Sequence, residues 1–116
     1  MSILTIAAIV FAIAAIGGLV LAKNLFSDKL PPWIISLVHA ALGATGLVLL
    51  IFAVFQGNTA SRLTAALGIL IVAALGGFFL ASFHIRKVIA PKSIVIIHAG
   101  VAVVGFLTLL SLVLGM

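Results

Sequence analysis

Two similar stretches, LVHAALGATG at residues 37–46 and IIHAGVAVVG at residues 96–105, each carry one histidine followed seven residues later by a glycine. Both lie in long apolar runs. The whole chain is 66% hydrophobic and only 6% charged, whereas soluble domains average about 25% charged residues. A polar side chain that interrupts such a run usually has a function. The two histidines are therefore the first candidates for a functional site.

Four apolar segments, at residues 3–22, 33–55, 63–83 and 93–114, are each long enough to cross a bilayer, which takes about 20 residues. They occupy nearly the whole chain. We therefore expect an all-α protein with a single integral membrane domain, residues 1–116, that forms a four-transmembrane-helix up-down bundle with short loops. We also expect the first segment to stay as a helix, because a signal peptide begins with basic residues and none precedes this segment.

The chain contains an internal repeat, in which residues 1–57 align with residues 60–116 at an offset of 59. His39 aligns with His98, and 17 aligned positions are identical, where composition alone gives about six. The bundle is therefore expected to be a duplicated two-helix hairpin. Because each unit has two spans, the copies should be related by a pseudo-twofold axis along the membrane normal.

Basic residues are concentrated at one side of the expected membrane domain. The loops after the first and third segments carry five of them, and the loop after the second segment carries one. They are Lys23, Lys29, Arg86, Lys87 and Lys92, against Arg62 alone. Since cytoplasmic loops are enriched in Lys and Arg, we expect a prokaryotic inner-membrane protein with these two loops in the cytoplasm and both termini outside. The lipid bilayer is the expected partner, and these few basic residues do not indicate nucleic-acid binding.

The repeat places His39 and His98 at the same depth. Each lies about six residues into a helix that begins on the same side, roughly 9 Å deep, and the second and fourth helices of such a bundle are diagonal neighbours. The two imidazole rings are thus expected to face a common centre. Small residues surround this level and leave space either for a flat group or for close helix packing. They are Gly17, Gly18, Gly43, Gly46, Gly76, Gly77 and Gly105.

This arrangement resembles the haem-binding core of membrane b-type cytochromes, such as the cytochrome b of quinol-oxidising complexes and the cytochrome b561 class. The matching positions are His39, His98, Gly18, Gly46, Gly77 and Gly105. The resemblance implies one haem b with the two histidines as axial metal ligands, and Arg86 and Lys87 as counter-charges for its propionates. It also implies one-electron transfer. The protein would exchange electrons with quinone, or it would be an electron-transfer component or quinone-linked oxidoreductase subunit of a larger redox complex. Those families commonly hold two haems, whereas this chain has histidines for one.

A second hypothesis is a non-catalytic scaffold or assembly subunit, whose histidines and glycines mediate helix packing. A buried histidine can hydrogen-bond a neighbouring helix, a contact worth on the order of 1 kcal/mol. A homo-oligomer is compatible with both hypotheses, and neither includes a catalytic residue. The spans contain no Asp or Glu, which argues against a proton-coupled exporter.

Two polar or aromatic residues outside the repeated pattern are expected at the membrane interface. His84 aligns with Leu25, so it has no partner in the first repeat. We expect it to be an interfacial polar residue, and Trp33 to be an interfacial anchor.

Overall fold

The computed structural model covers residues 1–116 and consists of four α-helices. They are α1 (Ile3–Phe26), α2 (Trp33–Phe55), α3 (Ser61–Ile85) and α4 (Lys92–Val113). Each helix is long and apolar enough to cross a membrane. The expected fold class, an all-α four-helix up-down bundle, is confirmed, and the four apolar helices fit an integral membrane protein.

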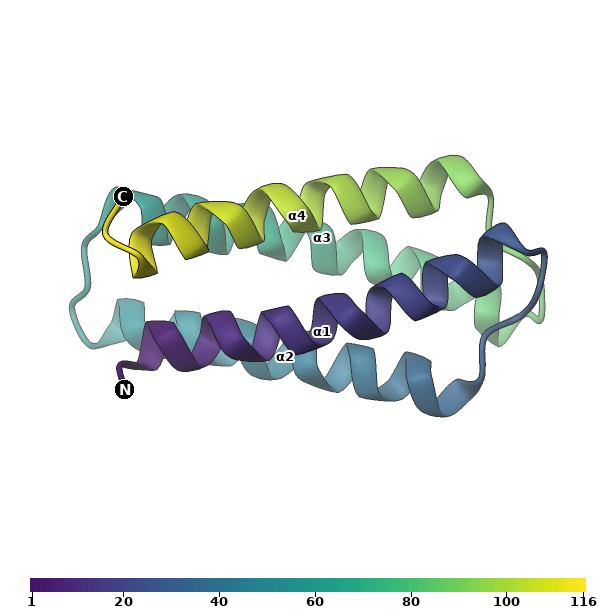
Figure 1. Cartoon of the computed structure of the whole chain (residues 1–116), viewed down its shortest axis with the longest axis horizontal. Coiled ribbons are helices and arrows are strands. Elements are labelled where there is room, and N and C mark those ends of the chain that lie inside the picture. Colours follow the sequence, from purple (N-terminus) through teal and green to yellow (C-terminus); the bar gives the residue numbers. More distant parts are fainter.

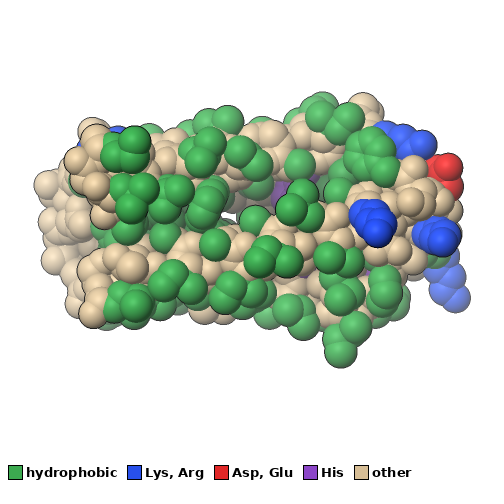
Figure 2. Space-filling view, viewed as in Figure 1, with side chains coloured by type: hydrophobic (Ala, Val, Ile, Leu, Met, Phe, Trp, Pro, Cys, Tyr) green, Lys and Arg blue, Asp and Glu red, His purple; other side chains and the backbone are tan.

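The helices run lengthwise through a bundle of 43 × 23 × 20 Å. Both termini lie at one end with the α2–α3 loop, and the α1–α2 and α3–α4 loops lie at the other (Figure 1). We call these the terminal end and the basic end. Lys and Arg side chains cluster at the basic end, and hydrophobic side chains cover the face in view (Figure 2).

The helix limits follow the repeat. α1 and α3 end at Phe26 and Ile85, 59 residues apart, and both extend beyond the apolar segments expected from sequence. Two residues later, Asp28 and Lys87 adopt positive φ angles of 57° and 58°. In both copies the next backbone N–H donates to a carbonyl of the last helical turn at 2.9 Å. The two hairpins thus end their first helix with the same left-handed turn.

The two hairpins pack more closely within themselves than against each other. α1 lies along α2, and α3 lies along α4, whereas the α1–α4 and α2–α3 contacts are sparser and the diagonal helices meet only through side chains. Figure 1 shows the two hairpins side by side along their length. The seams between the hairpins are therefore the loosest part of the bundle.

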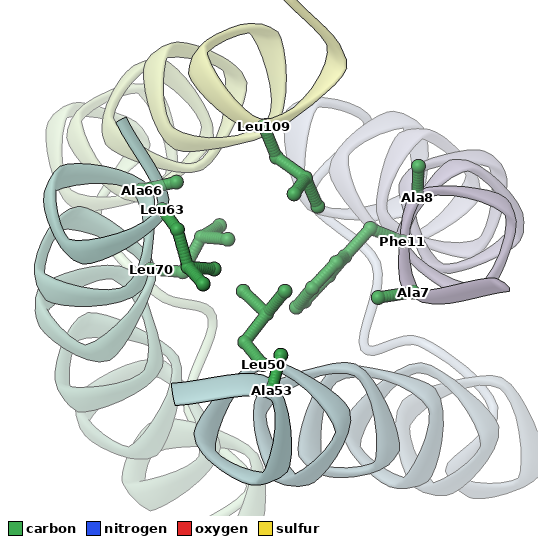
Figure 3. Close-up of a cluster of buried hydrophobic side chains, with 9 residues drawn as sticks. All are labelled: Ala7, Ala8, Phe11, Leu50, Ala53, Leu63, Ala66, Leu70 and Leu109. Carbon is green, nitrogen blue, oxygen red and sulfur yellow. The ribbon is translucent and has the colours of Figure 1, made fainter. Parts of the chain in front are cut away.

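The main core joins the hairpins near the terminal end. Side chains from all four helices converge there (Figure 3). They are Ala7, Ala8, Phe11, Leu50, Ala53, Leu63, Ala66, Leu70 and Leu109. A smaller cluster of Leu25, Ala90 and Val95 closes the basic end. The level of His39 and His98 lies between these two apolar clusters.

Candidate functional site

His39 reaches from α2 across to α1 in the same hairpin. Its Nδ1 lies 2.8 Å from the backbone oxygen of Ala14. Since a carbonyl oxygen only accepts, Nδ1 carries the hydrogen and donates it. This bond fixes the ring in one orientation and in one tautomer.

His98 makes the equivalent bond in the second hairpin. Its Nδ1–H donates to the backbone oxygen of Ala73 in α3, again at 2.8 Å. Ala14 and Ala73 are 59 residues apart, so the repeat preserves the acceptor as well as the histidine. Nε2 of each ring is left without a hydrogen-bond partner, and neither atom is sealed inside the protein. A backbone carbonyl that holds Nδ1–H is a common way to orient a histidine whose Nε2 binds a metal.

Two pairs of glycines make these bonds possible by admitting the imidazole rings. A Cβ atom on Gly18 would lie 3.1 Å from Cε1 of His39, and one on Gly77 would lie 3.3 Å from Cε1 of His98. Gly17 and Gly76 border the same rings at 3.5 Å or more. The space beside these four glycines is thus occupied by the histidine of the same hairpin.

The glycines further from the basic end face different neighbours. The ring of Phe11 fills the space beside Gly46, where an added Cβ atom would lie 2.5 Å from the nearest ring carbon. Leu70 and Ile69 fill the space beside Gly105. In this structure, side chains occupy the space beside these two glycines, where the sequence predicts room for a cofactor. Gly43 has no atom within 4 Å of its Cβ position.

The two histidines form a pair across the seam between the hairpins. Their ring centroids are 6.3 Å apart, and the ring planes stand at 83° to each other. The two rings therefore lie edge to face at one level of the bundle.

The surroundings of this pair are apolar and open at the sides. No third His, Cys, Asp or Glu joins the two imidazoles. A groove of about 400 Å³ between α3 and α4 is lined by His98 and mainly apolar side chains, among them Phe79 and Ile97. Figure 2 shows an opening between α1 and α4, with histidine atoms beside it.

His84 lies in the last turn of α3, at the basic end, and its side chain is buried against α2. Only 9% of the residue is exposed. Its ring stacks on the indole of Trp33, with centroids 3.7 Å apart and planes within 8°, and its Nδ1 lies 3.0 Å from Oγ of Ser36. One signal in the sequence points to this contact: Trp33, Ser36 and His39 are spaced by three residues and therefore share a face of α2.

Arg86 and Lys87, the residues expected to neutralise haem propionates, both lie at the basic end. Their side chains differ in how far other groups hold them. Arg86 donates from Nε to the backbone oxygen of Ser82 at 3.1 Å and stacks over the Phe83 ring at 4.7 Å. Lys87 is exposed and makes no ion pair. Arg86 is thus held against its own helix, whereas Lys87 is free to turn toward a bound anion.

His39 and His98 each have Nδ1–H held by a backbone carbonyl and Nε2 without a partner in the protein. Together they offer two nitrogen atoms that could bind a metal. No protein-family model, curated protein or solved structure matches this chain.

Proposed function

We propose that the protein is a small membrane b-type cytochrome, in which His39 and His98 hold one haem b for one-electron transfer. The observation that carries the proposal is the symmetric histidine pair. Both rings are oriented by a 2.8 Å bond to a backbone carbonyl, both keep Nε2 free, and their centroids are 6.3 Å apart.

The donor set fits a porphyrin-bound iron better than a bare ion. A zinc site would need four ligands, and the structure brings only two together. A haem would bring its other ligands with it, so His39 and His98 would be sufficient to hold it. Because the contacts between the hairpins are sparser than those within them, a flat group would enter between the hairpins more readily than between the helices of one hairpin. When held by these two histidines, a haem would supply reversible one-electron chemistry.

The chain's own residues would orient and insulate this group. The carbonyls of Ala14 and Ala73 hold the two rings in place and make Nε2 of each ring a stronger metal ligand. They also satisfy the two Nδ1–H groups, which would otherwise be costly in hydrocarbon. The apolar clusters on both sides of the histidine level exclude water from it.

We propose that the protein lies in the prokaryotic inner membrane with the basic end in the cytoplasm, because five of its six Lys and Arg residues lie at that end. In this orientation Lys87 and Arg86 would neutralise haem propionates at the cytoplasmic side. Electrons would pass to or from quinone or a partner subunit of a redox complex.

A scaffold subunit is the second candidate, and one observation favours it. Each histidine already clasps the two helices of its own hairpin through a hydrogen bond, and each is seated on a glycine pair. In that case the histidines would stabilise the hairpins with no cofactor.

Haem content separates the two candidates. The full chain is expressed in cells with haem supplied, purified in mild detergent, and assayed for haem b per chain and for its visible spectrum. The cytochrome hypothesis predicts one haem per chain with a low-spin spectrum. A folded, colourless protein that does not bind added haem would refute it and favour the scaffold.

A further inference from the structure

The repeat symmetry of the bundle is broken at the basic end by a polar cluster. His84 of α3 contacts Trp33 and Ser36 of α2, across the seam between the hairpins. In the other seam, the residues that align with His84 and Ser36 are Leu25 and Val95, which belong to one apolar cluster. An apolar pair is therefore sufficient to pack the two hairpins together at this level of the bundle. Packing alone does not require a histidine at position 84.

The surroundings of His84 suit both of its protonation states. The Ser36 hydroxyl can donate to a bare Nδ1 or accept from Nδ1–H, at the same 3.0 Å distance. The face of Trp33, parallel to the imidazole at 3.7 Å, attracts an imidazolium through a cation–π interaction. Nε2 has no partner in the protein and is not sealed from its surroundings. The ring can thus gain or lose a proton without leaving a buried group unsatisfied.

His84 is the one imidazole at the basic end, and histidine is the residue type that most readily exchanges a proton near neutral pH. The contacts from α2, Trp33 and Ser36, are neutral. Charged groups lie on its own helix end and on the neighbouring loops. They are Lys23, Lys29, Arg86, Lys87 and the ion pair of Lys92 with Asp28 at 3.6 Å.

The distance to the histidine pair allows electrostatic coupling. Gly77 of α3 borders the ring of His98, and His84 is seven residues, or two helical turns, further along the same helix. Seven residues span about 10 Å. At that distance charges in a poorly screened, apolar bundle still interact appreciably.

We propose that His84 is the proton-binding residue coupled to electron transfer at the His39–His98 site, an inference that rests on the proposed function. When the site gains one electron from a one-electron donor, His84 takes up one proton from water at the basic end. When the electron leaves, His84 releases the proton. The electron and the proton together leave the net charge of the bundle unchanged, and no other bond is made or broken.

The first test follows protonation of His84 directly, with no need for haem. Trp33 is the single tryptophan of the chain, and a protonated imidazole stacked on an indole quenches its emission. The comparison variant carries His84→Leu and Ser36→Val, which reproduces the apolar pair of the other seam and so retains a closed bundle. The emission of the full chain in detergent should titrate between pH 5 and 8, and that of the variant should not. A flat titration in the wild type would overturn the proposal.

The second test measures the midpoint potential against pH by mediated redox titration. The wild-type potential should fall as the pH rises, by up to about 59 mV per tenfold change in proton activity for one electron and one proton. The double variant should bind the same amount of haem and show a flat profile. A pH-independent wild-type potential, or an unchanged slope in the variant, would overturn the inference while the proposed function stands. A protein that binds no haem, as judged from its visible spectrum, would refute both the proposed function and this inference.

Discussion

Substitution of Gly46 by alanine tests the packing of α1 against α2 at a single atom. The added Cβ would lie 2.5, 2.6 and 2.7 Å from three ring carbons of Phe11. These distances are about 1 Å shorter than an ordinary carbon–carbon contact. Phe11 is buried in the main core, so its ring cannot move away without displacing other side chains.

The magnitude follows from a comparison with Gly43, on the same helix. Replacement of glycine by alanine in a helix contributes about 1 kcal/mol in favour of the helix, and this term is common to both sites. At Gly43 a Cβ meets nothing within 4 Å, whereas at Gly46 overpacking should cost about 1 to 3 kcal/mol. Gly46→Ala should therefore be less stable than Gly43→Ala by about 1 to 3 kcal/mol.

The assay is reversible unfolding in mixed detergent and SDS micelles, followed by helical circular dichroism. A double-mutant cycle with Phe11→Leu adds a second check, because the shorter side chain relieves the clash. The loss caused by Gly46→Ala should be smaller in the Phe11→Leu background. Equal stability of the Gly46 and Gly43 variants, or additive effects in the cycle, would refute this packing.

Three further predictions concern other parts of the chain. Gly18→Ala places a Cβ 3.1 Å from Cε1 of His39, so it should displace the ring and lower the haem bound per chain; full occupancy would contradict this. Lys87→Gly should stabilise the bundle by about 1 kcal/mol, because glycine adopts the positive φ of 58° without steric cost; denaturation in SDS should show a higher midpoint, and an unchanged one would count against it. Single cysteines introduced for labelling should be accessible from the cytoplasm at Asp28 and from outside at Ser2. The opposite pattern would reverse the proposed orientation.

Much of the fold could be predicted from the sequence because a bilayer imposes a simple rule on helix length. The apolar run at residues 33–55 corresponds to α2 without any change, since Pro32 precedes it and the polar residues Gln56 to Asn58 follow. α1 extends four residues past its predicted end, through Lys23, because a long basic side chain reaches water from within a helix. The diagonal placement of the two histidines also follows from the sequence, once the repeat and the short loops are known.

The side-chain neighbours could not be predicted in the same way. Helical spacing shows which residues share a face, but not which element lies opposite that face. The sequence predicts both Gly18 and Gly46 beside a cofactor, yet one borders His39 and the other borders Phe11. The burial of His84 depends on a partner in the other hairpin, 51 residues earlier in the chain. The spacing of Trp33 and Ser36 shows that they share a face of α2, but not that His84 packs against that face.

The central claim is that His39 and His98 bind the same iron, and the spin state of single ligand variants tests it most directly. Visible spectra are compared for the wild type, His39→Ala and His98→Ala, all expressed with haem supplied. We predict a low-spin spectrum for the wild type, and for each variant either loss of haem or conversion to a five-coordinate high-spin form, because one axial ligand is missing. A low-spin spectrum that survives removal of either histidine would contradict the claim.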